Sequence, residues 1–350
     1  MMAAISSGMR PWRDGDDDLE LSIEFVYAAA GLMRGYILRR LLALLPTLVL
    51  ASIIVFVTIR LIPGDVIDLM LSQNDVSADK KSRDDIIAAL GFDKPMWQQY
   101  LHWVSAIVFH GDLGKSLWQG TPVTEHLLAR LPVTFELGFI AMVVGLIIAL
   151  PIGIYSAVRQ DTAGDYIARS FSILLLAVPS FWLGTMVVVF PSIWWGWSPS
   201  VDYVAFFKSP ADNLSQMLLP GIVLGAALSA ITMRMTRTMM LEVLRQDYIR
   251  TAWAKGLGER LVIVRHALRN AMIPVVTLIG LQAPLLIGGA VIIEQIFVIP
   301  GMGLLLIDAV QQRDYPIITG VFLVVGVAVM LINLLVDLSY GFLDPKVRMR

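Results

Sequence analysis

Six apolar segments, each long enough to cross a lipid bilayer as a helix, dominate this sequence. None of them contains Asp, Glu, Lys or Arg, and a helix needs about 20 apolar residues to span the hydrocarbon core. Only 16% of the chain is charged, against about 25% in soluble domains. The sequence therefore predicts an all-α integral membrane protein with six spans, at residues 41–59, 137–158, 170–190, 217–233, 271–293 and 316–336.

The composition also excludes several classes of function. A chain without cysteine has no disulfide, thiolate metal site or cysteine nucleophile. A net charge of −1 gives no reason to expect nucleic acid as a partner. An independent secondary transporter or channel would carry ionisable groups or a polar lining within its spans, and the six uncharged segments speak against that class. An embedded enzyme needs a nucleophile beside a base or metal ligands at working spacing, and the sequence offers neither.

The connection between the fourth and fifth segments, residues 234–270, carries eight basic residues against three acidic ones. A single charge at the bilayer centre costs about 2.5–3.5 kcal/mol, so this connection must lie in water. Basic loops are enriched on the cytoplasmic side of membranes. With six spans, the basic residues before the first span and at the end of the chain fall on that same side. We therefore predict that both termini are cytoplasmic.

The sequence divides into four parts. Residues 1–33 are acidic, and we expect a disordered N-terminal extension, with Met33 as an alternative start. Residues 34–61 hold the first span. Residues 62–133 form a small extracytoplasmic insertion with helices predicted at 84–90 and 95–109. Residues 134–350 form the core domain, with spans two to six and the cytoplasmic connection.

Within the basic connection, residues 241–254 and 259–271 each place apolar side chains at helical spacing. Gly256 and Gly258 interrupt the run, since glycine is costly within a helix and common at its end. The pattern predicts an elbow of two helices and a turn that projects from the membrane. From the residues alone, a solvated amphipathic connection held on lipid headgroups by its arginines is an equally good alternative.

Sequence motifs favour the elbow. Arg250-Thr251-Ala252 and Gly256, followed after nine residues by His266-Ala267-Leu268, resemble the cytoplasmic signature loop of ABC-importer permeases. The wider stretches 247–257 and 265–270 resemble the dipeptide, oligopeptide and nickel branch of that family. The broader superfamily opens this loop with Glu-Ala-Ala, whereas the peptide branch has the Arg and Thr found here.

Two other regions carry the same resemblance. One comprises residues 111–116, 122–123 and 130–137, before the second span. The other comprises residues 294–303, 308–309 and 313–316, before the last span, and the chain end at 344–348 also fits. The resemblance covers residues 33–350 and implies a type I importer permease, a bundle of six transmembrane helices.

The resemblance also implies partners and a location. In such importers the elbow, or coupling helix, docks in a groove of a separate ATPase subunit. The implied complex contains a second homologous permease, two ATPase subunits and an extracytoplasmic binding protein, in the bacterial cytoplasmic membrane. ATP and Mg²⁺ would bind to the ATPase subunits. This chain would bind no cofactor and would not be an enzyme.

On this model the elbow carries the coupling residues. Ala252, Gly256 and Leu257 would pack at the contact, where small residues permit close approach. The basic side chains would pair with acidic groups of the ATPase. The full predicted set is Arg250, Thr251, Ala252, Lys255, Gly256, Leu257 and Arg260.

Gln282 and Glu294 lie in or beside the fifth span and are candidates for the solute path, because polar groups at membrane depth usually face a cavity or the bundle interior. The alternative, which we favour, is that they bond neighbouring helices or loop backbone. The implied solute is a di- or oligopeptide, since a mostly apolar path suits peptides of varied sequence when a separate protein selects them. Nickel, glutathione or another small solute is the alternative.

Two apparent motifs are rejected. Gly114-Lys115-Ser116 resembles the end of a phosphate-binding loop, but Phe109 stands where that loop needs its first glycine. The three histidines of the predicted insertion are eight and sixteen residues apart, which matches no helical pair of metal ligands. We therefore expect neither a nucleotide site nor a metal site on this chain.

Overall fold

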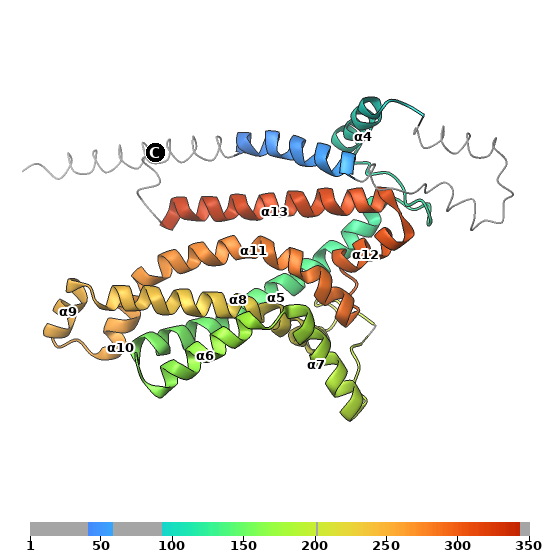
Figure 1. Cartoon of the computed structure of the whole chain (residues 1–350). Coiled ribbons are helices and arrows are strands. Elements are labelled where there is room, and N and C mark those ends of the chain that lie inside the picture. Colours follow the sequence, from blue (N-terminus) through green and yellow to red (C-terminus); the bar gives the residue numbers. More distant parts are fainter. Residues whose placement is uncertain (1–40, 59–92, 201, 344–350) are drawn as a thin grey trace, which may run out of the picture.

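The computed structural model describes residues 41–58, 93–200 and 202–343, the last seven of them as backbone only. Every regular element in these residues is a helix, which confirms the predicted all-α class (Figure 1). Leu41–Thr58 comes first. It is followed by α4 (Met96–His110), α5 (Val123–Val158), α6 (Ala163–Ala177), α7 (Ser180–Trp195), α8 (Pro210–Leu244), α9 (Asp247–Ala254), α10 (Glu259–Leu261), a π-helical segment (Val262–Leu268), α11 (Arg269–Phe297), α12 (Met302–Gln312) and α13 (Tyr315–Leu343).

Five helices in the described residues are long and apolar enough to cross a membrane, and α6 with α7 makes a sixth span if the pair is counted as one. The third predicted span, residues 170–190, is divided between two helices, because α6 and α7 meet at an angle of 93°. The bend lies at Val178 and Pro179. Proline has no amide hydrogen to donate into a helix, and it disfavours helical backbone in the residue before it.

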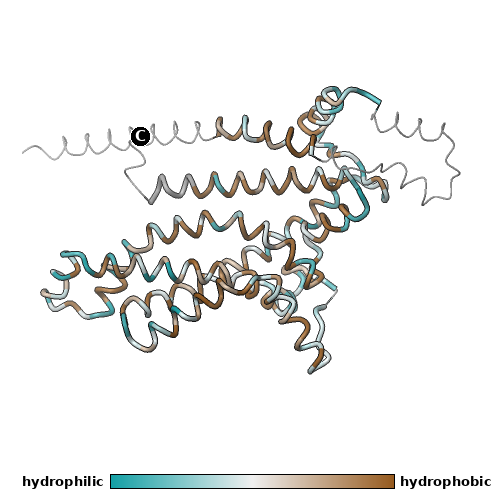
Figure 2. The backbone as a smooth tube through the Cα atoms, viewed as in Figure 1, coloured by the Kyte–Doolittle hydropathy of each residue, from teal (hydrophilic) through white to brown (hydrophobic). Residues whose placement is uncertain are grey.

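The spanning helices are longer than their uncharged segments. α5 begins at Val123, within residues 62–133, so the helix of the second span starts before the expected domain boundary. α8 has 35 residues and is about 50 Å long at 1.5 Å per residue, against a hydrocarbon core of about 30 Å. The first part of the basic connection, residues 234–244, is therefore a helical extension of α8 beyond the hydrocarbon. Figure 2 shows hydrophilic residues gathered at both ends of the bundle.

The core lies where α5, α8 and α11 meet. Leu137 of α5, Met217 of α8 and Ile293 of α11 belong to one buried cluster, each with at most 1% of its surface exposed. α5 and α8 make the most extensive contact in the described chain. This central packing fixes the positions of the helix ends, where the elbow and Glu294 lie.

Val55 of the first helix packs against the cluster that contains Ile318 and Val321 of α13, and this helix is also held by α4. Phe56 is 1% exposed, and its ring centroid lies 5.3 Å from that of Tyr100 and 5.6 Å from that of Trp103. α4 confirms the helix predicted at 95–109. The helix predicted at 84–90, the acidic residues 1–33 and the motif at 344–348 lie outside the described residues.

Candidate functional site

The elbow is a short helix standing across the ends of two long ones. α8 ends at Leu244, and the chain becomes extended at Gln246 (φ −71°, ψ 149°) before α9 begins. The predicted continuous helix 241–254 is therefore wrong, because this break separates the end of α8 from α9. After Ala254 the chain turns through Gly256 into α10, the π-helical segment and α11. The part of the elbow that lies between α8 and α11 is thus residues 245–268, which is shorter than the predicted 241–271.

The inner face of α9 is packed against its own chain. Ile249 is 0% and Ala252 6% exposed, in one cluster with Met240, Val262 and Ala267, which are each fully buried. A buried cluster of this kind makes α9 a rigid extension of α8 and α11, because protein interiors are close-packed. Ala252 therefore contacts other residues of its own chain, and half-buried Leu257 packs on the same cluster. Most of the Ala252 side chain is therefore covered by its own chain, whereas Leu257 keeps part of its surface exposed.

The outer face of α9 carries the predicted charged residues. The side chain of Arg250 is 75% exposed and pairs with Asp247 at 3.2 Å. Such exposed pairs contribute little to stability, so this arginine can exchange its partner at low cost. Thr251 is exposed, with its hydroxyl donating to the Asp247 carbonyl at 3.0 Å. Lys255 and Arg260 are exposed.

Gly256 shapes the turn after α9. Its φ of +76° lies in the left-handed region, and a Cβ built there would meet no atom within 4 Å. The residue is needed for its backbone conformation, which glycine adopts without strain. Close approach of another surface, the reason expected from the sequence, is not required to explain it.

Two aromatic residues on the elbow were missed by the sequence reasoning. Tyr248 and Trp253 are 44% and 43% exposed. The Tyr248 hydroxyl accepts a hydrogen bond from Asn270 Nδ2 at 2.8 Å, which joins α9 to α11. Exposed aromatic side chains are enriched at protein interfaces. The signal available in the sequence was the presence of Tyr248 and Trp253 in a connection predicted to lie in water.

At the opposite end of the bundle, Glu294 closes the turn between α11 and α12. The residue is fully buried. Its carboxylate accepts hydrogen bonds from Thr134 Oγ1 at 2.6 Å, Gly303 N at 2.7 Å and Leu304 N at 3.1 Å. The carboxylate thus caps the N-terminus of α12, where a negative charge is favoured.

The same turn explains two of the sequence motifs. A Cβ on Gly301 would lie 2.2 Å from the carboxyl carbon of Glu294, so only glycine fits. Thr134 also accepts a hydrogen bond from Met302 N at 2.8 Å, and it comes from the motif at 130–137. The two motifs are therefore one structural unit, in which Glu294 bonds loop backbone, as the favoured alternative had it.

Gln282 lies between α8 and α11. It is 7% exposed, and its Nε2 lies 3.4 Å from the Thr232 hydroxyl. Both candidate path residues, Gln282 and Glu294, are thus buried between elements of this chain. Neither lines a described pocket.

The rejected phosphate-loop motif has a structural role at this end. Ser116 Oγ donates to Asp314 Oδ2 at 2.5 Å, and Trp118 Nε1 donates to the Gln312 carbonyl at 2.7 Å. The turn at 111–116 is thereby fastened to the start of α13. In the described residues no three His, Cys, Asp or Glu side chains gather as a metal site. His126 instead lies 2.7 Å from the Thr121 hydroxyl.

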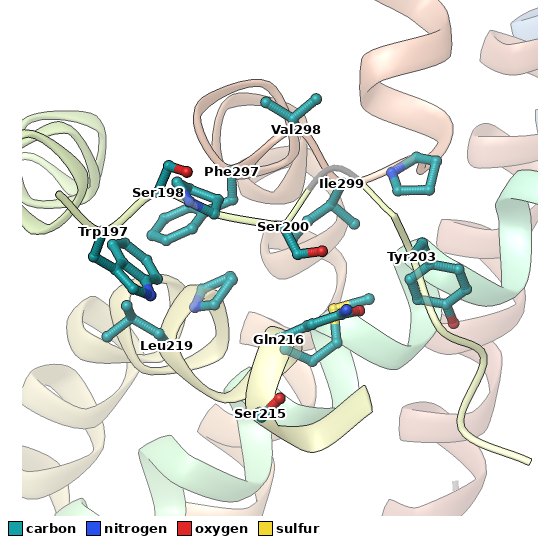
Figure 3. A pocket seen from close by; sticks show the side chains of 14 residues that line it. Trp197, Ser198, Ser200, Tyr203, Ser215, Gln216, Leu219, Phe297, Val298 and Ile299 are labelled. Carbon is teal, nitrogen blue, oxygen red and sulfur yellow. The ribbon is translucent and has the colours of Figure 1, made fainter. Parts of the chain in front are cut away.

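A pocket of about 220 Å³ opens beside this end, between the α7–α8 connection, the start of α8 and the turn after α11 (Figure 3). The Gln216 amide braces the connection through Val204 N at 3.1 Å and the Asp202 carbonyl at 2.9 Å. Tyr203 donates to Glu136 at 2.7 Å. Burial, together with this bond, raises the pKa of the Tyr203 phenol, so the hydroxyl stays protonated. The pocket wall is therefore preformed, with aromatic and amide groups.

The helical bundle, the elbow at one end and the motif turns at the other agree with one family. Residues 149–349 match the family model described as the binding-protein-dependent transport system inner membrane component. Residues 33–138 match the model of the N-terminal part of such membrane components. This chain belongs to that family. It is a multi-pass permease of the inner membrane and a transport subunit.

Relatives named as transport permeases align over nearly their whole length. The chain is 40% identical over 339 residues to the dipeptide transport system permease protein DppB of Escherichia coli K12, covering 90% of this chain and 99% of that protein. It is 40% identical over 318 residues to the oligopeptide transport system permease protein AppB of Bacillus subtilis, with the same coverage. The glutathione transport system permease protein GsiC of Pectobacterium atrosepticum is 39% identical over 317 residues, again with 90% and 99% covered.

A solved structure of an ABC importer has the same fold. A chain of the inward-facing MetNI methionine ABC transporter superposes with a TM-score of 0.53 at 16% identity, covering 63% of this chain and 98% of that one. The predicted type I importer permease fold is confirmed. At this identity the likeness concerns the fold alone.

Proposed function

We propose that this permease carries di- or oligopeptides into the cell as part of an ATP-driven importer. The observation that carries the proposal is the similarity, over nearly the whole chain, to permeases named for dipeptide and oligopeptide transport. The mostly apolar spans suit solutes that vary in side chain. Glutathione, itself a small peptide, is the second candidate, because a glutathione permease is almost equally similar.

The proposed complex pairs this chain with a second homologous permease, two ATPase subunits and an extracytoplasmic binding protein. ATP and Mg²⁺ bind to the ATPase subunits, and both termini of this chain lie in the cytoplasm. The elbow docks on an ATPase subunit, and closure of the ATPase pair tilts the long helices between two packed arrangements. The rigid attachment of α9 to α8 and α11 supports this role, because a force on α9 would move both helices together.

The proposed contact differs from the one expected from the sequence. Arg250, Lys255 and Arg260 supply charge, and the exposed aromatic ring of Trp253 supplies apolar area. Thr251 borders this surface. Ala252 and Leu257 support α9 from within, and Gly256 sets the turn.

The other end of the bundle would face the binding protein. The pocket in Figure 3 lies at this end, where solute would be delivered. Its size and its mixture of aromatic, amide and hydroxyl groups suit contact with a peptide backbone or with loops of the binding protein.

Uptake measurements test the proposal. Cells that lack their own peptide importers would express this chain with the products of its neighbouring genes, and uptake of labelled dialanine, glutathione and Ni²⁺ would be compared. We expect ATP-dependent uptake of dialanine. Uptake of glutathione or Ni²⁺ without dialanine would overturn the assignment of solute, and transport by the purified chain alone would overturn the assignment of mechanism.

A further inference from the structure

A second, smaller groove lies between α6 and α8, toward the α9 end of the bundle. Its volume is about 160 Å³. Ile173, Leu176 and Met233 contribute apolar side chains to its wall, and three arginines, Arg169, Arg234 and Arg237, also border it. An apolar groove with clustered cations at one end is suited to an amphiphile with a negative head.

One of the three arginines is fully engaged. Arg237 binds the buried carboxylate of Asp165 through two hydrogen bonds, of 2.9 Å from Nε and 2.8 Å from Nη2. Asp165 is 0% exposed and also accepts a hydrogen bond from the Ser156 hydroxyl. This network joins α5, α6 and α8, and it holds the floor of the groove in a fixed shape.

The other two arginines keep donors to spare. Arg169 Nε lies 3.6 Å from Asp165 Oδ1, beyond hydrogen-bond distance, and in the described chain this buried atom has no hydrogen-bond partner. The Arg169 guanidinium lies 4.4 Å from the Tyr166 ring centroid, which orients it. Arg234 is exposed, and no carboxylate of the described residues lies within 4.0 Å of it.

The balance of charge at the groove is positive. Arg237 and Arg169 lie beside the carboxylate of Asp165, Arg234 adds a third positive charge to the wall of the groove, and the more distant Asp161 adds a second negative charge. Arginine binds phosphate with two parallel donors. A phosphate group placed between Arg169 and Arg234 would neutralise this excess of positive charge.

We propose that this groove binds an anionic phospholipid, with the phosphate on Arg169 and Arg234 and an acyl chain along Ile173 and Leu176. The depth is suitable, because Arg234 lies ten residues before the end of α8, or about 15 Å, where the long helix leaves the hydrocarbon. Basic pockets between transmembrane helices on the cytoplasmic side bind anionic headgroups. The assignment of the groove to the cytoplasmic leaflet depends on the proposed orientation of the chain. The proposal that the groove binds lipid does not depend on it.

Lipid retention by the purified full-length chain tests the proposal. The protein would be exchanged into vesicles of phosphatidylcholine with a minor share of phosphatidylglycerol, then extracted, and its bound lipids measured by native mass spectrometry. We expect phosphatidylglycerol to be retained in preference to phosphatidylcholine. Arg234→Gln and Arg169→Gln should each weaken its binding about fivefold, since one basic residue near an anionic surface contributes about 1 kcal/mol.

Two further variants separate the groove from general surface charge. Arg269→Gln removes an exposed positive charge at the same end of the bundle and should leave retention unchanged. Ile173→Trp replaces a side chain that is 66% exposed with a larger one, and it should displace lipid without altering charge. Equal loss in Arg269→Gln and Arg234→Gln, or no preference for phosphatidylglycerol, would overturn the proposal.

The competing occupant is another subunit. A photo-crosslinking amino acid at position 173 in the assembled importer should form adducts with lipid. Adducts mainly with a second permease would show that protein covers the groove, and would also overturn the proposal. These measurements do not depend on transport, so they can fail while the proposed function stands.

Discussion

Thr134 and Glu294 are 160 residues apart in the sequence, and the hydroxyl of the first donates to the buried carboxylate of the second at 2.6 Å. The same hydroxyl accepts from Met302 N at 2.8 Å. The pair joins the second span, the fifth span and α12 at one point. The stability of this end of the bundle should therefore depend strongly on the side chain of Thr134.

Replacing Thr134 by valine should cost about 1–3 kcal/mol, because a buried carboxylate oxygen and a buried amide each lose a partner. The measurement is the unfolding temperature of the purified permease in detergent. Thr134→Ser keeps the hydroxyl and serves as the control. Equal unfolding temperatures for the valine and serine variants would contradict the structural role assigned to this bond.

The turn after α9 gives a prediction on coupling. Gly256→Ala should strain the backbone by about 1–2 kcal/mol, because a residue with a Cβ resists the left-handed region. We expect reduced ATP-dependent uptake at normal protein levels in the membrane. Gly258→Ala is the matched control, since Gly258 has φ −65° and open space around a built Cβ. Full uptake by Gly256→Ala would show that the turn is dispensable.

Trp253 gives a prediction on assembly. Trp253→Ala should lower the affinity for the ATPase subunit about tenfold or more, the effect of removing an aromatic residue that is central to an interface. Co-purification of the ATPase with tagged permease measures it. Trp97→Ala, at an exposed tryptophan of α4, should have no effect. Loss of ATPase co-purification in both variants, or in neither, would show that Trp253 is not part of the proposed contact.

The rejected phosphate-loop motif can be tested through its two polar residues. Lys115→Ala should leave uptake unchanged, because its charge has no role in the turn. Ser116→Ala should cost about 1–3 kcal/mol of stability, since buried Asp314 loses its hydroxyl partner. Thermal unfolding and uptake would be measured on both. A loss of ATP-dependent uptake in Lys115→Ala with unchanged stability would reopen the nucleotide interpretation.

Hydropathy and charge were sufficient to predict the helical class and the approximate positions of the long apolar helices, because apolar length is the main constraint in a bilayer. They could not predict the bend at Pro179, since proline is also tolerated in membrane helices when neighbours compensate. Whether Ala252 faced a partner or its own chain also could not be read from the sequence. The direction in which Ala252 faces depends on the break at Gln246. This break is a feature of backbone conformation that no residue type in the motif predicts.

The contact between Thr134 and Glu294 shows a different limit. Each residue lay in a motif that the sequence identified, and the bonding of Glu294 to loop backbone was the favoured alternative. The partner itself came from packing 160 residues away in the chain, which one sequence does not encode in any local pattern.

The most direct test of the central claim is the side of the membrane on which the elbow lies. The chain has no cysteine, so Arg250→Cys introduces a single thiol on the elbow, and Phe207→Cys one at a residue that is 97% exposed in the α7–α8 connection. A thiol reagent that cannot cross the membrane would be applied to spheroplasts and to inverted vesicles. The account predicts that Arg250→Cys is labelled only in inverted vesicles and Phe207→Cys only in spheroplasts. Labelling of Arg250→Cys in intact spheroplasts would contradict it.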